Sequence, residues 1–451
     1  MRGKTKKTLL YRNLEGQTLL TFHSYNIGVI SMMFVKPSLT SPSFLKVPTQ
    51  WFLLAEMVFL IWNSLNDPLV GHYVKGWSVT QRLTALDAPA ALWVASFACF
   101  FVLPIPLSGW MVGVHLIACL VMYDGFLSYV LLVHASLLAD LSNDPVERAA
   151  CNTWSSVFSI AGSSAVFFST LLWDAHRTAR FRVYCMVVGL CALLVFQLSF
   201  RLLRSGVVPK ASDAEVVAAD SPSFSLRKFA SQLKGHGNFW IFCCTNLIQV
   251  FNCHFNSNFL LTALSSTAFR SLGTSTLFVL AAVLPHVVVV LLAPFLITRG
   301  LYSVMRTLFA FKLLSCLFVL MWGWSAALMA AFLFVNKVMG EAICRHGNLV
   351  VADLVDEDMA LHGEVASRSS LILGANALFT KPGQAVAAVV GWFVFRGQSE
   401  VLDHGESLFI YVVAVPAICG AMQMLLWSQF SLRGAKLAQI KEAKVSQSKI
   451  V

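Results

Sequence analysis

Long apolar runs are the feature that most restricts how this chain can fold. A helix needs roughly 20 apolar residues to cross about 30 Å of membrane hydrocarbon. The sequence holds clear runs of this kind at 51–72, 89–107, 109–139, 151–173, 181–203, 238–264, 272–298, 301–322, 324–352, 369–396 and 407–430. A weaker run at 17–35 is interrupted by polar residues. We therefore expect about twelve membrane-spanning helices. We number them 1 to 12 in chain order, with the run at 17–35 as span 1.

The composition agrees with a chain whose solvent is lipid. Hydrophobic residues make up 57% of the chain, charged residues only 12%, and the mean hydropathy is +0.71. A water-soluble domain keeps about a quarter of its residues charged, because its surface must face water. These values exclude a soluble globular protein and favour an all-α polytopic membrane protein.

The placement of basic residues predicts the topology. Short cytoplasmic loops of membrane proteins are enriched in Lys and Arg. Of the 33 Lys and Arg residues, 23 lie at the chain termini or beside the loops that follow even-numbered spans, whereas 7 lie on the other side. We therefore expect both termini in the cytoplasm. Topology thus explains the net charge of +11, and we expect no nucleic-acid partner.

No sequence pattern indicates a metal site, a cofactor or an enzyme. Most of the 11 cysteines lie within apolar runs, where a thiol acts as a small hydrophobic group. Cys243, Cys244, Cys253 and His254 do not have the spacing of metal ligands. We find no set of nucleophile, base and orienting group and no phosphate-binding loop, so we expect no enzymatic activity.

The chain divides into two similar halves. We expect a six-helix half at 1–203, a polar cytoplasmic linker at 204–237, a second six-helix half at 238–430 and a basic cytoplasmic tail at 431–451. Ala-Asp-Leu occurs at the end of span 4 and again at the end of span 10, at 139–141 and 352–354. Parallel six-span repeats with a site between them are typical of the major facilitator superfamily. This repeat favours a transporter over a receptor or an enzyme.

Two carboxylates lie within the apolar runs of the first half. An ionisable group at bilayer depth costs about 2.5–3.5 kcal/mol on insertion scales, so such residues often have a function. Asp67 precedes Pro68 in span 2, and Asn63 lies one turn earlier on the same face. These oxygens suit a proton or a hard cation. The alternative is that Asp67 is solvated at the end of the span. Asp124 lies near the middle of span 4, where we favour a functional role.

The second half carries a polar cluster in span 7 and cations in spans 10 and 11. Gln249, Asn252 and His254 lie between apolar neighbours and suit a hydroxyl-rich solute, although they could equally join helices. Lys337 and Glu341 are spaced to pair with each other. Lys381 has no acidic residue within one turn. Its partner must therefore come from another helix, and the carboxylates of the first half would serve.

These polar segments also carry a family resemblance. The stretches LIWNSLNDPLVG, QVFNCHFNSNF, VVADLVDED and LFTKPGQAVA, at 60–71, 249–259, 350–358 and 378–387, resemble the animal transmembrane protein 180 family, also named the major facilitator domain-containing protein 13A family. The resemblance covers spans 2 to 12. That family in turn resembles the glycoside-pentoside-hexuronide:cation symporters and the sodium-linked lysolipid carriers.

The resemblance implies roles for individual residues. The symporters carry Asp-x-x-x-Asp-Pro in span 2, and both carboxylates hold the coupling cation. Here Asn63 replaces the first acid and Asp67 matches the second. Asp124 matches a sugar-binding acid, and Lys381 matches a lysine of the cation site. The loss of one acid weakens a sodium site, whose affinity depends on the charge of its ligands, so proton coupling or uncoupled movement becomes more credible.

Together these patterns predict a monomeric twelve-helix transporter of the plasma membrane. We expect it to move a small polar solute, for which a sugar is one candidate, by alternating access, coupled to H⁺ or Na⁺ and without a cofactor. The expected cation-coupling residues are Asn63, Asp67 and Lys381, and the expected substrate-binding residues are Asp124, Gln249, Asn252 and His254. The alternatives are a lysolipid-type carrier on the same fold and a non-transporting scaffold or receptor, because fold alone does not fix function.

Overall fold

The computed structural model describes residues 49–101, 110–141, 144–172, 179–218, 226–265, 274–323, 326–362, 368–396 and 405–450. Every element within these ranges is an α-helix. In chain order the helices are α2 (Thr49–Tyr73), α3 (Val79–Thr84), α4 (Asp87–Cys99), α5 (Trp110–Leu141), α6 (Pro145–Leu172), α7 (Ala179–Ala218), α8 (Leu226–Gly235), α9 (Gly237–Ser265), α10 (Thr274–Arg299), α11 (Leu301–Trp322), α12 (Ala326–His362), α13 (Ser369–Thr380), α14 (Pro382–Arg396), α15 (Gly405–Gln429) and α16 (Ala435–Ile450).

The expected spans correspond closely to these helices. Ten of the helices (α2, α4 to α7, α9 to α12 and α15) take one expected span each, and the span expected at 369–396 is divided between α13 and α14. The span expected at 17–35 lies outside the described residues. The prediction of an all-α polytopic membrane protein is confirmed.

The lipid-facing helices are recognisable by their exposed apolar side chains. Within the described residues, the stretches long and apolar enough to cross a membrane by themselves are Trp110–Leu137, Ala179–Arg201, Leu301–Trp322 and Tyr411–Gln429. On α7, Leu190, Leu194 and Leu198 lie along one face and are 57–61% exposed. Exposing such a stripe to water would be unfavourable at about 25 cal/mol per Å² of apolar area, whereas lipid tails can cover it. Polar residues dilute the apolar character of helices such as α9 and α12.

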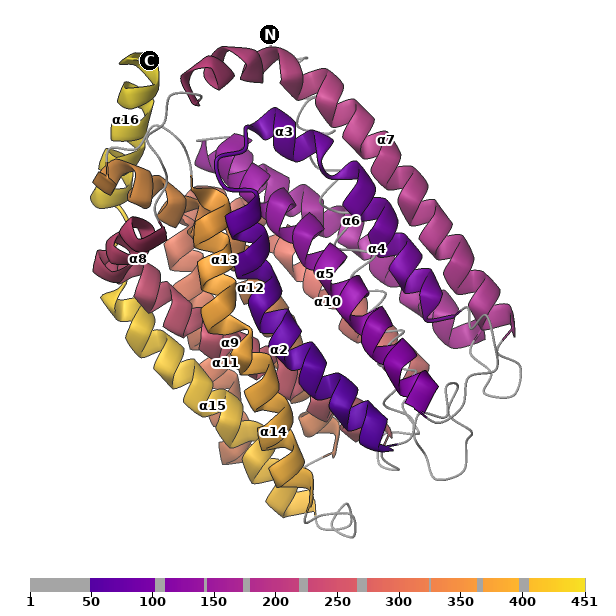
Figure 1. Cartoon of the computed structure of the whole chain (residues 1–451). Helices are drawn as coiled ribbons and strands as arrows, with labels where there is room; N and C mark the ends of the chain where they lie inside the picture. Colours follow the sequence, from indigo (N-terminus) through magenta and orange to yellow (C-terminus); the bar gives the residue numbers. More distant parts are fainter. Residues whose placement is uncertain are drawn as a thin grey trace.

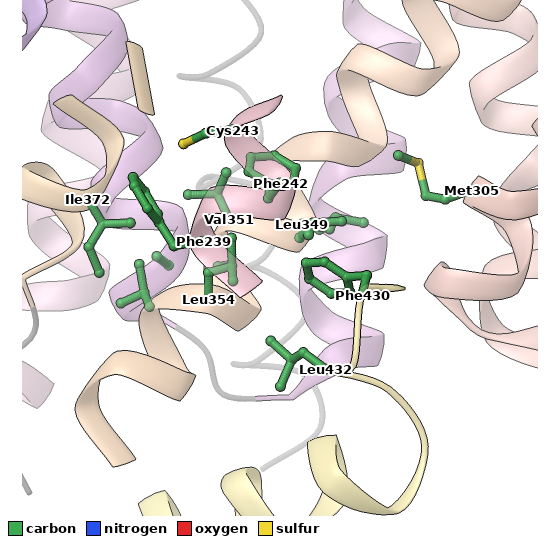
Figure 2. Packing of buried hydrophobic residues seen from close by; sticks show 14 of the residues in the cluster. Phe239, Phe242, Cys243, Met305, Leu349, Val351, Leu354, Ile372, Phe430 and Leu432 are labelled. Carbon is green, nitrogen blue, oxygen red and sulfur yellow. The ribbon is translucent and has the colours of Figure 1, made fainter. Parts of the chain in front are cut away.

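Each half of the bundle is held together by a hydrophobic core of its own. The helices before residue 219 bury an aromatic cluster that includes Trp93, Phe97 and Phe196. The helices after residue 225 bury another, in which Phe239 and Phe430 are prominent (Figure 2). We call these two groups of helices the N-terminal half and the C-terminal half. In Figure 1, α7 and α15 lie at opposite flanks of the bundle, and α2 and α13 lie side by side between them.

Glycines allow α2 and α13 to pack very closely across the two halves. A Cβ atom at Gly71 would lie 2.6 Å from the carbonyl oxygen of Ser370, and one at Gly374 would lie 3.0 Å from the carbonyl oxygen of Asp67. The first distance is too short for a side chain, and the second would require the neighbouring backbone to shift. The chain then breaks between α13 and α14, because Pro382 has no N–H to continue the helix. Lys381 lies at this break, directly opposite α2.

The segments expected to be the linker and the tail both contain helices. Within the segment at 204–237, expected to be a polar linker, α7 continues to Ala218 and α8 forms at Leu226–Gly235. The helix continues through Pro209, and the Ala and Glu residues that follow are good helix formers. In the tail, α16 packs against α12. We call the end of the bundle that holds α3, α8 and α16 the tail end.

Candidate functional site

An ion pair joins the two halves at the break in span 11. The Lys381 Nζ atom lies 2.9 Å from Asp67 Oδ2, and both side chains are largely buried. Asp67 lies in the last two turns of α2, immediately before Pro68, and Lys381 comes from the turn between α13 and α14. The expectation that a carboxylate from another helix would balance Lys381 is met by this contact. Because each partner belongs to a different half, the pair depends on how the halves are placed.

Asp124 belongs to the same network through Asn66. The Nδ2 group of Asn66 donates a short hydrogen bond to Asp124 Oδ2, and its Oδ1 atom accepts from Lys381 at 3.0 Å. Lys381 also donates to the hydroxyl of Ser128 at 3.2 Å. The lysine ammonium therefore has three oxygen acceptors: Asp67, Asn66 and Ser128. Two carboxylates and one ammonium lie within this network, an arrangement able to take up one further positive charge.

Asn63 completes the network on the α14 side. Its Nδ2 group donates to Gln384 Oε1 at 2.9 Å, which makes a second polar contact between the halves. Asn63, Asn66, Asp67 and Asp124 are all buried, with 2–8% of each residue exposed. The structure thus pairs Asp67 with Lys381 and places Asn63 one helical turn before Asp67, in contact with Gln384, and their role in coupling stays a prediction.

The other expected substrate residues lie apart from Asp124. In the described part of the chain, Asp124 makes no hydrogen bond with Gln249, Asn252 or His254. The Nε2 group of Gln249 donates to the Gly340 carbonyl at 2.8 Å, and its Oε1 atom accepts from Gln423 at 2.8 Å, so this side chain joins helices within the C-terminal half.

Asn252 and His254 differ in their surroundings. Asn252 is fully buried, and neither atom of its amide has a hydrogen-bond partner among the described residues. His254 is half-buried and lies within electrostatic range of Lys337 and Glu341. Lys337 and Glu341 pair at 2.7 Å, as their spacing predicted. The roles of Asn252 and His254 in binding a solute stay predictions.

A buried ion cluster closes the tail end across the two halves. Arg148, at the start of α6, donates to both carboxylate oxygens of Asp356 on α12, at 2.7 and 3.2 Å. Its Nη1 group also lies 3.4 Å from Asp353. All three side chains are buried, so the cluster is shielded from water. We call these three residues the tail-end lock.

The internal repeat reappears in a second contact at this end. Asp140 and Asp353 occupy the same place in the two copies of Ala-Asp-Leu. Asp353 binds Arg148 at the start of α6, in the other half. Asp140 pairs with Arg82 of its own half at 2.5 Å. It also accepts a hydrogen bond of 2.9 Å from the hydroxyl of Ser369, which lies at the start of α13 in the other half. Residues related by the repeat therefore make corresponding contacts between the halves.

The sequence contained signals for the residues that complete the network. Asn66 precedes Asp67, Ser128 lies one turn after Asp124, and Gln384 lies one turn after Lys381. Each is polar within an apolar run. A search for uncharged polar residues one turn from each intramembrane charge would have found the last two, whereas the contacts themselves depend on how the helices are rotated.

Sequence relatives place the chain in a family. It is 34% identical to transmembrane protein 180 of Gallus gallus over 460 residues, a match that covers 89% of each chain. The chain belongs to the transmembrane protein 180 family. Transmembrane protein 180 of Mus musculus is 32% identical over 477 residues, with 91% of each chain covered. No family model matches the chain. The resemblance drawn from the polar segments is thus confirmed for this family.

Solved structures show the fold that this transmembrane protein 180 relative adopts. A bacterial homologue of the iron transporter ferroportin in an outward-facing state superposes with a TM-score of 0.68 and 16% identity, covering 95% of this chain and all of that one. The human organic anion transporter MFSD10 (TETRAN) superposes with a TM-score of 0.59 and 13% identity, covering 94% of this chain and 99% of that one. The chain therefore shares the helical fold of these two proteins.

Proposed function

We propose that this chain is a secondary transporter that moves a small polar solute by alternating access and couples this movement to a cation gradient. The observation that carries the proposal is the ion pair between Asp67 and Lys381, which links the two halves deep within the bundle. Intramembrane charges are expensive unless they serve a pathway, and major facilitator halves rock around a site at this depth. Rocking requires this pair to break, so any ion that weakens it favours the movement.

A proton suits this site better than a sodium ion. The ammonium of Lys381 is surrounded by oxygens of Asp67, Asn66 and Ser128, which are the kind of ligands that a hard cation would use. Asn63 supplies an amide where a carboxylate would strengthen sodium binding. A proton on Asp67 would remove its attraction for Lys381, and the lysine could then shift toward Asp124 through Asn66, its present acceptor. Protonation would thus loosen the contact between the halves.

The orientation follows from the positions of the basic residues. The tail end carries the surplus of Lys and Arg, so we place it in the cytoplasm, with the protein in the plasma membrane. The tail-end lock and the close packing of α2 on α13 then close the cytoplasmic side. This arrangement corresponds to an outward-facing state, the state of the ferroportin homologue that superposes on the chain.

Uptake into proteoliposomes tests the proposal. Purified full-length chain would be reconstituted and screened with sugars, polyols, organic acids and amino acids, with and without an inward H⁺ or Na⁺ gradient. We expect at least one solute to accumulate with the H⁺ gradient, and Asp67→Asn to prevent this accumulation. A screen in which no solute enters faster than into protein-free vesicles would favour the non-transporting scaffold instead.

A further inference from the structure

A second charged cluster lies on α12, away from the Asp67–Lys381 network. Lys337, Glu341 and Arg345 are spaced one turn apart and share one face of the helix. Glu341 is paired with Lys337 at 2.7 Å. Lys337 also donates to the hydroxyl of Ser257 on α9 at 3.2 Å. The cluster thus holds two cations and one carboxylate, and that carboxylate forms its ion pair with Lys337.

Arg345 lies within electrostatic range of Glu341, but its direct contacts are with hydroxyl groups. Its Nη2 group donates to Ser159 at 3.2 Å and its Nη1 group to Ser155 at 3.5 Å, both on α6 in the other half. Within the described ranges, no carboxylate lies at ion-pair distance from its guanidinium. Only 7% of the residue is exposed. A buried guanidinium normally pairs with an anion, because hydroxyl groups neutralise no charge.

Unpartnered polar atoms lie on the same face of α6 as the two serines and on α10. Ser163 lies one turn after Ser159 and Asn152 two turns before it, on the same face of α6. The hydroxyl of Ser163, the Nδ2 group of Asn152 and the Nδ1 atom of His286 on α10 are all buried without a hydrogen-bond partner in the described part of the chain. The ring of His286 lies within electrostatic range of Arg345. Buried polar groups usually have partners, so this set indicates a place built to contact something polar.

We propose that Arg345, Lys337, Ser155 and Ser159 form a subsite for an anionic group of the transported solute, a carboxylate being the simplest. A carboxylate matches the planar fork of a guanidinium, and serine hydroxyls can donate to its remaining lone pairs. The solute is then acidic or zwitterionic, and not a neutral sugar. This inference rests on the proposed transport function and specifies its substrate class.

The position of the subsite couples binding to the movement of the halves. Arg345 belongs to the C-terminal half, whereas Ser155 and Ser159 belong to the N-terminal half. An anion that replaces these serines as the partner of Arg345 would change a contact between the halves. The anion subsite and the Asp67–Lys381 network therefore both contribute contacts between the N-terminal and C-terminal halves.

Binding to the purified full-length protein tests the subsite without any ion gradient. The probes are two pairs that differ in a carboxylate: gluconate and sorbitol, and lactate and propylene glycol. The readout is the Tm, because a ligand that binds only the folded protein raises it. We expect the acid of at least one pair to raise the Tm more than its neutral partner.

Variants then assign the selectivity to Arg345. Arg345→Gln should weaken acid binding about tenfold or more, the size expected for losing a hydrogen bond to a charged group. Arg345→Lys should retain part of the selectivity, and Arg306→Gln, which removes an exposed arginine of α11, should retain all of it. If Arg345→Gln does not fold, Lys337→Gln provides the same comparison and should reduce the preference for the acid.

The outcomes separate this inference from the transport proposal. Equal stabilisation by acid and neutral partner, no stabilisation by any acid, or undiminished acid selectivity in Arg345→Gln would each overturn the subsite. Uptake of a neutral solute in proteoliposomes would leave transport intact while removing the acidic substrate class. Selective acid binding without any gradient-driven uptake would instead support the subsite and count against transport.

Discussion

The ammonium of Lys381 lies 2.9 Å from the carboxylate of Asp67, although 314 positions separate the two residues in the chain. One residue comes from α2 in the N-terminal half and the other from the break between α13 and α14 in the C-terminal half. The contact is flanked by the close packing of α2 on α13 at Gly71 and Gly374. This ion pair therefore forms only when the two halves have the relative position seen here.

Breaking this pair from either side should abolish coupled uptake. Asp67→Asn leaves Lys381 without its carboxylate, and removing one partner of a buried pair commonly costs about 3–5 kcal/mol. We expect uptake to fall to the level of empty vesicles while surface expression remains. The exchange variant Asp67→Lys with Lys381→Asp should recover part of the stability lost in either single variant. If the exchange is no better than the single variants, the two residues do not act as a pair.

Asp124→Asn should abolish uptake without unfolding the protein. The amide keeps the shape of the carboxylate and can still accept from Asn66, but it cannot hold a charge or take up a proton. Uptake and surface expression would be measured side by side. Asp87→Asn is the matched control, because Asp87 pairs with Arg204 at a partly exposed position, where such pairs contribute about 0–1 kcal/mol. Equal activity in both variants would remove Asp124 from the site.

Asn63→Asp should make the protein responsive to sodium. A carboxylate four residues before Asp67 would add a charged oxygen to the network, and two unit charges 4 Å apart interact by about 4 kcal/mol at an effective dielectric of 20. Desolvation offsets part of this, and we expect sodium to bind about tenfold more tightly or better. The measurement is the Tm in sodium chloride against choline chloride. Asn63→Gln, which keeps the amide, should show no such shift.

Arg148→Gln should open the tail end. The variant leaves Asp356 buried without its partner, and we expect the free energy of unfolding to fall by about 3–5 kcal/mol. Cys151, one turn from Arg148, should then react faster with a maleimide, as followed by peptide mass spectrometry. Combining Arg148→Gln with Asp356→Asn removes both charges and should recover much of the stability. Unchanged labelling in the single variant would show that this cluster does not close the tail end.

Acidic pH should release α16 from α12. The end of α12 lies beyond its expected span at 324–352, and Lys436 of α16 contacts Glu357 there at 2.9 Å. Burial raises the pKa of Glu357, but hydrogen bonds from His236, Lys436 and Asn238 outweigh it, so the pKa of Glu357 lies below its ordinary value. The docked state therefore favours the ionised carboxylate. Its stabilisation is present above the ordinary pKa and is lost as the pH falls through the lowered one.

Hydrogen exchange measures this release. The amides of α16 should exchange faster as the pH falls, after correction for the intrinsic pH dependence of exchange. Glu357→Gln should show fast exchange already at neutral pH and little further change in acid. Protection of α16 that is the same in both proteins at every pH would contradict the role assigned to Glu357.

The sequence alone determined the class of fold and the residues worth examining. Apolar runs of membrane length leave few alternatives to a helical bundle, because backbone groups in lipid must bond within their own segment. The high cost of buried charge then marks Asp67, Asp124 and Lys381. Charge balance further predicted that Lys381 would pair with a carboxylate from another helix, without deciding which.

The tertiary structure decided which polar residues meet. Asp124 contacts Asn66, whereas Gln249 turns into the C-terminal half toward Gln423. Arg345 lies within the apolar run at 324–352, and the structure places it against Ser159 of α6. Spacing along one helix fixes which residues share a face, but the rotation and crossing of helices depend on side-chain packing between them. Contacts between distant helices therefore emerge only when the bundle is assembled.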